Sequence, residues 1–269
     1  MKNERPIGVF DSGIGGLTVV RALMNHLPHE NLIYFGDTAR VPYGPKSAQV
    51  VREYAVQDTE VLLQHDVKMI VVACNTVSAV ALDVVQKRAK VPVLGVIIPG
   101  AEAAARATTK KRVGVVGTVG TILSKAYTHA LRQANPSIEV FSQSCPLFVP
   151  LVEEGWISHP ATELIAREYL FPLTLDKIDT LILGCTHYPL LKEVIDSVLH
   201  KNVMLIDSGE STALAAARLL QESNLLNPSL MKSRIQFFVS DIPNKFSEVG
   251  ERFLGQKLGT VQRVSGFSA

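Results

Sequence analysis

Residues 69–76 have the sequence MIVVACNT, and residues 181–189 have the sequence LILGCTHYP. Each stretch is a short apolar run, typical of a buried strand, that is followed by a cysteine, small polar residues and a helical pattern. The two cysteines, Cys74 and Cys185, therefore fall at matching places in the two halves of the chain. We infer that their thiols face each other across a cleft, which suits chemistry that needs an acid and a base on opposite sides of a substrate.

Outward from these stretches, short runs rich in Val and Ile alternate with longer helical patterns. This alternation indicates an α/β fold in which mostly parallel sheets are flanked by crossover helices. We predict strands near residues 7–10, 31–35, 68–73, 93–97, 112–116, 138–141, 179–183, 203–206 and 235–239. We predict helices over residues 16–27, 48–65, 76–89, 121–134, 161–170, 188–200, 209–221 and 244–254.

The order of these features repeats along the chain. Each half opens with a strand and a turn of small residues, which begins at Asp11 in the first half and at Gly117 in the second. Asp11 precedes Cys74 by 63 residues, and Gly117 precedes Cys185 by 68. The repeat predicts two similar α/β domains. Ligands of open α/β sheets bind at the carboxyl ends of the strands, so we expect one site in a cleft between the domains.

Length and composition exclude several classes of protein. The chain has 269 residues, of which 47% are hydrophobic, enough to bury one large core or two smaller ones. Its 27 basic and 25 acidic residues give a net charge of +2, which does not indicate binding to nucleic acid or anionic lipid. No signal peptide or transmembrane run is visible, and three cysteines do not make a disulfide framework. We therefore expect a cytoplasmic protein with no membrane or nucleic-acid partner.

The cysteines have alternative interpretations. A free cysteine is often a small core residue, and Cys145 fits that description. Cys74 and Cys185 differ because each stands at a predicted helix start, where amide dipoles favour a thiolate, and is followed by small polar residues. Dithiol oxidoreductases usually carry Cys-x-x-Cys, whereas this pair is 111 residues apart. His187 follows Cys185 closely, but the short ligand spacing of a zinc site is missing, so we expect no metal.

The turn at residues 11–16, DSGIGG, only loosely resembles a phosphate loop. It lacks both Gly-Lys-Ser/Thr and the dinucleotide pattern Gly-x-Gly-x-x-Gly. The carboxylate of Asp11 would repel a phosphate and suits an ammonium group better. The alternative is that Asp11 only caps the following helix.

Polar residues at the predicted strand ends form a second group of candidates. Asn75, Thr76 and Thr186 can donate hydrogen bonds to a ligand carboxylate, or can cap helices. His187 can shuttle or orient the proton of a neighbouring thiol, unless it is an ordinary surface histidine. We add the further small-anion contacts Ser12, Tyr43 and Gly44.

Five stretches together resemble the cofactor-independent aspartate/glutamate racemases, and among them the glutamate racemase family. They are residues 8–19 (GVFDSGIGGLTV), 35–44 (FGDTARVPYG), 73–76 (ACNT), 146–153 (PLFVPLVE) and 183–191 (LGCTHYPLL). The resemblance covers about residues 1–220. Residues 225–269 match no motif and are expected only to pack against the rest.

The resemblance implies a domain organisation and a set of site residues. The first domain would comprise residues 1–98 plus 209–269, and the second residues 99–208, with the active site between them. Cys74 and Cys185 would be the two acid/base residues, assisted by Asp11, Glu153 and His187, and less directly by Asp37. Whether Glu154 assists stays open. The substrate would lie among Asp11, Ser12, Tyr43, Gly44, Asn75, Thr76, Thr186 and His187.

The resemblance also implies a reaction. Glutamate would be the substrate, D-glutamate for bacterial peptidoglycan the product, no cofactor would be needed, and a homodimer would form. Two thiols suit this chemistry, because one removes the Cα proton from one face while the other returns a proton to the opposite face. Three alternatives are a racemase of aspartate or another small amino acid, a non-catalytic amino-acid-binding protein, and a thiol redox enzyme.

Overall fold

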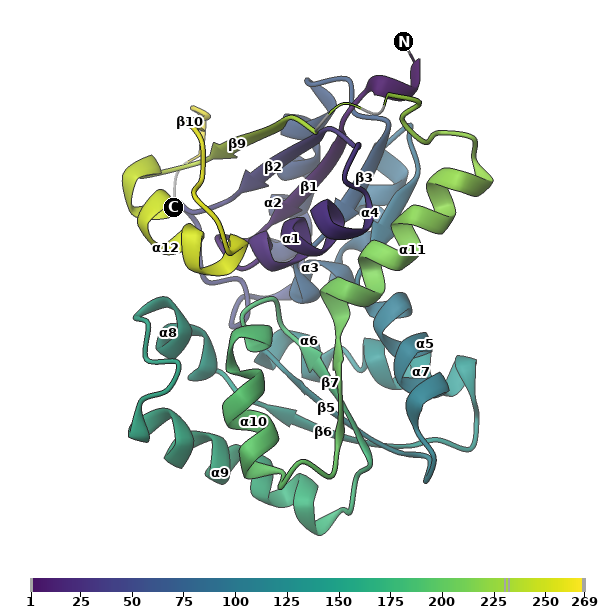
Figure 1. The fold of residues 1–269 in the computed structure, drawn as a ribbon, viewed down its shortest axis with the longest axis vertical. Helices are drawn as coiled ribbons and strands as arrows, with labels where there is room; N and C mark the ends of the chain where they lie inside the picture. Colours follow the sequence, from purple (N-terminus) through teal and green to yellow (C-terminus); the bar gives the residue numbers. More distant parts are fainter. Residues whose placement is uncertain (1, 230, 232, 268–269) are drawn as a thin grey trace.

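Two parallel sheets, one in each half of the elongated molecule, dominate the computed structural model, which describes residues 2–229, 231 and 233–267 (Figure 1). In the described residues the first sheet has the strand order β10-β9-β2-β1-β3-β4 and the second the order β6-β5-β7-β8. The strand bounds are β1 Ile7–Asp11, β2 Leu32–Gly36, β3 Met69–Val72, β4 Val93–Gly95, β5 Arg112–Gly117, β6 Glu139–Ser144, β7 Thr180–Gly184, β8 Met204–Asp207, β9 Ile235–Val239 and β10 Val261–Arg263. The predicted α/β class with two parallel sheets is confirmed.

The repeat predicted from the sequence is visible in the strand order. In the first sheet β2-β1-β3-β4 are neighbours, and in the second β6-β5-β7-β8 follow the same order. The cysteine-bearing strands β3 and β7 thus lie beside the first strand of their half, with Phe10 opposite Val72 in one sheet and Gly117 opposite Gly184 in the other. Because parallel strands end at one edge, this order brings each turn and each cysteine to the same edge of its sheet.

Helices cover both faces of each sheet. The α-helix bounds are α1 Leu17–His26, α2 Ala48–Leu63, α3 Asn75–Val80, α4 Leu82–Arg88, α5 Ile97–Ala107, α6 Val119–Leu123, α7 Ala126–Ala134, α8 Phe148–Glu153, α9 Pro160–Leu175, α10 Lys192–Val198, α11 Ser208–Glu222 and α12 Pro243–Leu254. Two short 3₁₀ helices are η1 Lys2–Glu4 and η2 Tyr188–Leu191. In the described part of the chain, no helix has the length and apolar character needed to cross a membrane.

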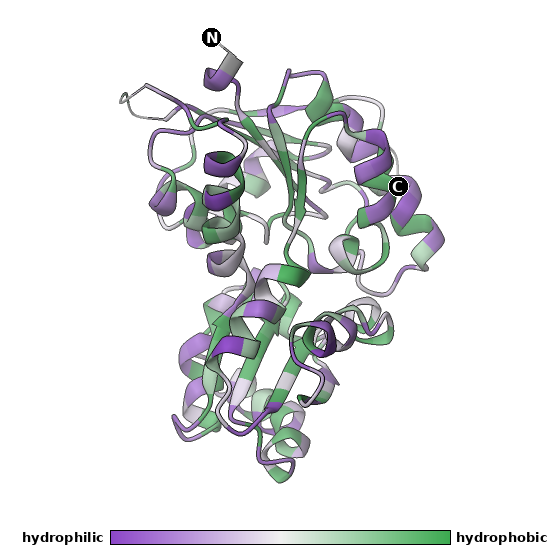
Figure 2. Ribbon diagram, turned by 90° about the vertical axis from the view of Figure 1, so that its right-hand side faces the viewer, coloured by the Kyte–Doolittle hydropathy of each residue, from purple (hydrophilic) through white to green (hydrophobic). Residues whose placement is uncertain are grey.

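The strands β1, β2, β3 and β7 are buried along their whole length, as expected for parallel sheets covered by helices. In β3, Met69 and Val71 belong to one core cluster, whereas Ile70 and Val72 belong to another on the opposite face. Figure 2 shows the hydrophobic strands in the middle of each half. The cluster that contains Met69 and Val71 also takes in Tyr188 of the second half, so apolar packing continues from one half into the other.

The chain passes between the halves through two helices. α5 leads from β4 to β5, and α11 leads from β8 back to the first sheet, where β9 and β10 extend its edge beside β2 (Figure 1). The first sheet therefore draws on both ends of the chain and the second on its middle. The exact domain boundaries, residues 1–98 plus 209–269 for the first domain and 99–208 for the second, remain a prediction.

Several elements differ from their predicted form. We missed α5 because Pro99 and Gly100 suggest a turn, although proline is tolerated in the first turn of a helix. We also missed α8 and β10. The helix predicted over 121–134 is interrupted at Lys125, which has a left-handed φ of 57°. The helix predicted over 76–89 is divided between α3 and α4, and the one predicted over 188–200 begins as the 3₁₀ helix η2.

Candidate active site

A cavity of about 390 Å³ lies where the strand ends of the two sheets face each other. Its volume falls in the range of small-molecule sites, roughly 300–1,000 Å³. Ten of the eleven residues predicted for the site line it, namely Ser12, Tyr43, Gly44, Cys74, Asn75, Thr76, Glu153, Cys185, Thr186 and His187. The two thiols therefore come from different sheets and share one cavity.

Cys74 is held between β3 and α3. It occupies the N-cap position of α3, and its thiol donates to Oγ of Ser12 over 3.5 Å. Ser12 follows β1, the strand beside β3, so the sheet register sets this contact. Burial, and to a smaller extent the nearby charge of Asp11, together raise the pKa of the Cys74 thiol to about 12.

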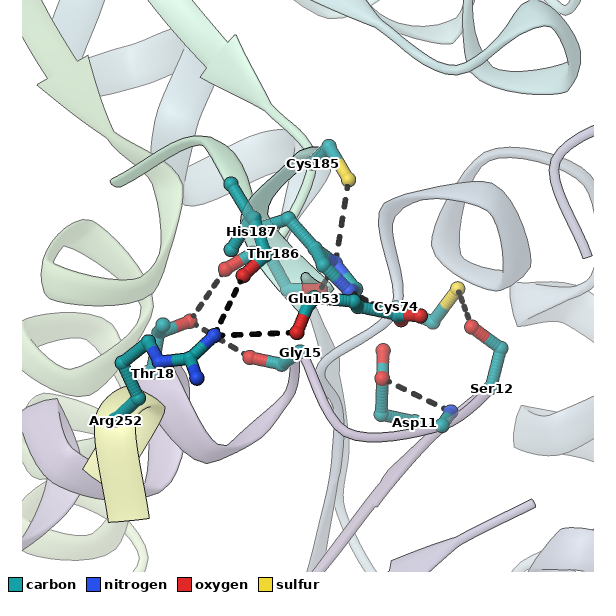
Figure 3. A network of polar contacts seen from close by, with 12 residues as sticks. Asp11, Ser12, Gly15, Thr18, Cys74, Glu153, Cys185, Thr186, His187 and Arg252 are labelled. Atoms are coloured by element: carbon teal, nitrogen blue, oxygen red, sulfur yellow. Dashed lines mark hydrogen bonds and ion pairs between the residues drawn. The ribbon is translucent and has the colours of Figure 1, made fainter. Parts of the chain in front are cut away.

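Cys185 directly follows β7 and has a different partner. Its Sγ lies 3.8 Å from Nδ1 of His187, and Nε2 of His187 lies 2.9 Å from Oε1 of Glu153 (Figure 3). Glu153 is the last residue of α8, so this relay joins two elements of the second half. Burial is the main cause that raises the pKa of the Cys185 thiol.

These pKa directions correct one expectation. The sequence predicts that helix starts lower the thiol pKa, yet burial outweighs any such effect at both cysteines. The helix after Cys74 is only the short α3, and Cys185 precedes a 3₁₀ turn rather than an α-helix. Both cavity thiols therefore favour the protonated form in this structure.

Asp11 lies beneath the cavity wall rather than in it. The carboxylate is almost completely buried, and its Oδ2 accepts from the backbone N–H of Gly13 over 3.1 Å. Oδ1 has no hydrogen-bond partner among the described residues. Burial raises the pKa of Asp11, while the electrostatic interaction with His187 acts in the opposite direction. Figure 3 places Asp11 beside Ser12 and close to Cys74.

Gly15 explains why the turn after β1 is rich in glycine. A Cβ atom on Gly15 would come within 2.2 Å of Oγ1 of Thr186 and 2.5 Å of Nδ1 of His187. The turn thus has no side chain at the point where it meets the loop that follows Cys185. Thr18 stabilises the contact between the turn and this loop, because its hydroxyl lies 3.0 Å from the carbonyl oxygen of Thr186 and 2.9 Å from that of Gly15.

Asn75 and Thr76 connect the first half to the second. Oδ1 of Asn75 accepts from the hydroxyl of Tyr127 over 2.7 Å, and its Nδ2 lies 3.5 Å from Oγ of Ser208. Oγ1 of Thr76 lies 2.9 Å from Oγ1 of Thr118. These side chains are therefore oriented by residues across the cleft.

Tyr43 and Gly44 line the cavity, but the Tyr43 hydroxyl and the Gly44 carbonyl bind other parts of the protein instead of facing a ligand. The Tyr43 hydroxyl is turned out of the cavity, toward the carboxylates of Asp37 and Asp58. The carbonyl of Gly44 accepts from the N–H of Gly120, so this loop docks on α6. Tyr43 therefore offers its ring to the cavity, rather than its hydroxyl.

Two weaker candidates lie outside the cavity. Asp37 is buried in an ion pair with Arg40, whose Nε donates to Oδ2 of Asp37 over 2.6 Å. Glu154 lines a neighbouring cavity of about 180 Å³ beneath α12. Among the described residues, no group of three or more His, Cys, Asp or Glu side chains is placed to hold a metal ion.

Sequence reasoning missed several residues of the cavity wall. Thr118 stands directly after β5, where Ser12 stands after β1, so the repeated strand order carried a signal for it. Val149 and Pro150 of α8 carried no such signal, because an apolar helix residue looks the same whether it lines a core or a cavity. The missed lining residues are Gly13, Val41, Pro42, Pro45, Thr118, Val119, Pro146, Val149 and Pro150.

Comparison with known proteins gives a consistent result. Residues 17–216 match the family model described as Asp/Glu/Hydantoin racemase. The chain is 54% identical over 259 residues to a glutamate racemase from Syntrophus aciditrophicus, covering 96% of both chains. It superposes with a TM-score of 0.92 on the glutamate racemase of Francisella tularensis in complex with D-glutamate, at 45% identity and 98% coverage of both chains. For a glutamate racemase isoform from Bacillus anthracis the TM-score is 0.94, at 40% identity, with 97% of this chain and 98% of that one covered.

Proposed function

The chain belongs to the Asp/Glu/hydantoin racemase family, and from this premise we propose that it interconverts L- and D-glutamate by a two-thiol mechanism. The observation that carries the proposal is the placement of Cys74 and Cys185, from different sheets, in the wall of one cavity of about 390 Å³. The enzyme is an isomerase, and it needs no cofactor in this mechanism.

Racemisation poses a geometric problem that two bases solve. The Cα proton leaves from one face of the substrate, and a new proton must arrive at the other. A single base would have to move around the carbon, whereas two thiols on opposing walls each serve one face. In each turnover one sulfur begins as a thiolate and takes the proton, while the other begins as a thiol and gives one. The two exchange their states when the reaction runs in reverse.

Only one of the thiols is ionised at the start of a turnover. Two negative sulfurs beside one small ligand would repel each other, which raises the energy of the doubly ionised state. Each thiol also has a group beside it that can hold a proton. Cys74 has Asp11, whose pKa is raised by burial, and Cys185 has His187, which is oriented by Glu153. We assign Asp11 and His187 the role of exchanging protons with the thiols, and Glu153 the role of orienting His187.

The carbanion formed at Cα needs stabilisation, because its negative charge spreads onto the α-carboxylate. Hydroxyl and amide donors placed before the reaction provide this stabilisation at little reorganisation cost. The cavity wall offers such donors from both halves, including Ser12, Thr76, Thr118 and Thr186. Its apolar residues, such as Val149, exclude water and strengthen these contacts.

In this scheme each cysteine removes the Cα proton from one enantiomer only. By analogy with the family, Cys185 takes the proton from L-glutamate and Cys74 takes it from D-glutamate. The D-glutamate supplies the synthesis of bacterial peptidoglycan. The enzyme works in the cytoplasm, where its three free cysteines stay reduced, and it functions as a homodimer.

A chiral-column assay tests the proposal. Purified enzyme is incubated with L-glutamate in the absence of any added cofactor, and the expected result is an equal mixture of the two enantiomers. A parallel incubation with L-aspartate gives little or no turnover if glutamate is the substrate. Substantial turnover of L-aspartate alone would assign the enzyme to a different substrate.

Incubation in deuterated water separates the remaining alternatives. A racemase incorporates deuterium at Cα of glutamate, whereas a protein that only binds the amino acid leaves the Cα–H bond intact. A redox enzyme would form a reversible disulfide between Cys74 and Cys185, which mass spectrometry detects after mild oxidation. Binding without exchange would contradict the proposal.

A further inference from the structure

The last turn of α12 reaches from the first half of the molecule to the Glu153–His187 pair of the second. α12 covers Pro243–Leu254 and follows β9 of the first sheet. Its residues Arg252 and Phe253 each contact one member of that pair. No motif in residues 225–269 indicated such a role.

Arg252 binds the end of α8. Its Nη1 donates to the carbonyl of Val152 over 3.0 Å and to the carbonyl of Glu153 over 3.1 Å (Figure 3). The last carbonyls of a helix lack partners within the helix, and a cationic side chain satisfies them and complements the helix dipole. Arg252 therefore fixes the backbone of the residue whose carboxylate holds His187.

The turn after α8 leaves room for this guanidinium. Gly155 has a φ of 78°, and a Cβ atom at this position would lie 3.1 Å from Nη1 of Arg252. The glycine thus serves both the left-handed backbone and the approach of α12. The space beside Gly155 in the second half is thus occupied by the guanidinium of Arg252 from the first half.

Phe253 contacts the other member of the pair. Its ring meets the His187 ring edge to face, with centroids 5.1 Å apart and an angle of 82° between the planes. Phe253 is completely buried, so the contact is fixed by packing. The His187 ring is thus held by Phe253 and by the bond to Glu153, while Nδ1 faces Cys185.

We propose that the last turn of α12 is a positioning element for proton transfer at Cys185. Arg252 and Phe253 hold the Glu153–His187 pair in line with the Cys185 thiol, and they have no equivalent role at Cys74, which lies beside Ser12 and Asp11. This inference rests on the proposed two-thiol racemisation. It gives the C-terminal segment a part in the reaction although it lies outside the cavity wall.

Isotope effects in the two directions test the inference. Because enantiomers have equal free energy, kcat/KM must stay equal for L- and D-glutamate in every variant. Arg252→Ala should lower it in both directions about three- to tenfold, in keeping with the loss of one or two hydrogen bonds. With Cα-deuterated L-glutamate, the isotope effect on kcat/KM should be larger in this variant than in the unmodified enzyme, because Cys185 removes that proton more slowly. With Cα-deuterated D-glutamate, the isotope effect on kcat/KM should be smaller than in the unmodified enzyme. In this direction Cys74 removes the labelled proton, and the later reprotonation by Cys185 becomes the slower step.

Control variants distinguish positioning from general loss of structure. Arg252 is exposed, so Arg252→Ala is expected to fold, and Arg252→Lys should restore part of the rate. Glu251→Ala, on the same turn and also exposed, should leave rates and isotope effects unchanged. Phe253→Leu keeps an apolar side chain, removes the ring contact and should shift the isotope effects in the same two directions.

The outcomes separate this inference from the proposed function. If the unmodified enzyme does not racemise glutamate, the proposed function fails. If the unmodified enzyme is active but the isotope effects of Arg252→Ala and Phe253→Leu match its own in both directions, the positioning role is wrong. The positioning role is also wrong if the isotope effects for both enantiomers rise together or fall together.

Discussion

The Sγ atom of Cys185 lies 3.8 Å from Nδ1 of His187, whereas the residue two positions after Cys74 is Thr76. The two cysteines thus share a strand-end position in matching sheets but differ in their chemical partners. Cys74 has Ser12 and the buried carboxylate of Asp11 beside it, and Cys185 has an imidazole oriented by Glu153. The repeated fold places the sulfurs symmetrically, and the loops make the two proton transfers chemically distinct.

Replacing either thiol should abolish turnover, which is the first prediction. We expect Cys74→Ala and Cys185→Ala each to lower kcat by at least about 10²–10⁴, the usual contribution of a general acid or base. Cα exchange in deuterated water should then depend on the enantiomer. Cys74→Ala should retain slow exchange only from L-glutamate, and Cys185→Ala only from D-glutamate.

A third variant provides the control for this experiment. Cys145 is buried outside the cavity, so Cys145→Ala should keep near-normal kcat. Turnover close to that of the unmodified enzyme in either Cys74→Ala or Cys185→Ala would rule out the two-thiol mechanism.

The second prediction concerns Thr18, which links the first half to the loop of Cys185. The buried Thr18 hydroxyl lies within hydrogen-bond distance of the Thr186 carbonyl. Thr18→Val keeps the shape but removes the donor, so the free energy of unfolding should fall by about 1–3 kcal/mol, the cost of an unsatisfied buried acceptor. We also expect kcat to fall, because the backbone beside Cys185 loses its support. Urea unfolding and the chiral assay measure the two effects.

Thr18→Ser is the matched variant for this test. It keeps the hydroxyl and loses one methyl group, so its kcat should stay close to normal and its loss of stability should be about 0.8 kcal/mol. If Ser and Val at position 18 lower kcat equally, the hydroxyl is not what supports the loop.

The third prediction follows from a count of protons in the buried cluster behind the cavity. The Tyr43 hydroxyl contacts a carboxylate oxygen of Asp37 and another of Asp58, yet it has only one proton to donate. Burial raises the pKa of Asp58 well above its ordinary value, which favours the protonated form of this carboxyl group. Arg40 pairs with both carboxyl groups, through Nε with Asp37 over 2.6 Å and through Nη2 with Asp58 over 2.9 Å.

Amide substitutions distinguish the two carboxyl groups. Asp58→Asn puts a neutral amide in place of a carboxyl group whose charged form is disfavoured by burial, and it should change the free energy of unfolding by less than about 1 kcal/mol. Asp37→Asn removes the carboxylate that accepts hydrogen bonds from both Arg40 and the Tyr43 hydroxyl in a buried cluster, and it should cost about 3–5 kcal/mol. Urea unfolding of both variants tests this assignment, and equal losses would show that it is wrong.

Local patterns were sufficient to predict much of the fold and the cavity wall. Cys74 and Cys185 are recognisable because an apolar strand that ends in a thiol and small polar residues is a local signal. Strand order then brings these ends together, since parallel strands finish at one edge. Features set by packing between distant segments were not predictable. Arg252 contacts a residue 99 positions away, and nothing in its neighbourhood marks it.

The same limit explains two errors of detail. Tyr43 was expected to present its hydroxyl to a ligand, but that choice depends on Asp58, which lies on α2 and carries no motif. The thiol pKa was expected to fall at helix starts, but the deciding quantity is burial, which follows from the whole fold. Sequence patterns locate side chains on elements, and long-range packing decides which way they turn and which charge they carry.

The fourth prediction uses the raised thiol pKa values to set the alkaline stability. An unfolded cysteine ionises near pH 8.5, whereas burial raises the pKa of Cys74 to about 12 and raises those of Cys145 and Cys185 as well. Above about pH 8.5 the unfolded chain therefore loses thiol protons that the folded chain keeps, and the free energy of unfolding falls as pH rises. The contribution of each buried thiol should steepen through this window toward a slope of about 1.4 kcal/mol per pH unit.

Cys145→Ala isolates one of these contributions without touching the cavity. The variant is expected to be less stable at pH 8, because a buried side chain is shortened, but its stability should decline less steeply above that pH. The gap between the two proteins in urea unfolding should therefore narrow by about 1 kcal/mol between pH 8.5 and 9.5. Lysine and tyrosine ionisation affects both proteins alike and cancels in the difference. A gap that stays constant up to pH 10 would mean that the Cys145 thiol ionises as readily in the folded protein as in the unfolded chain.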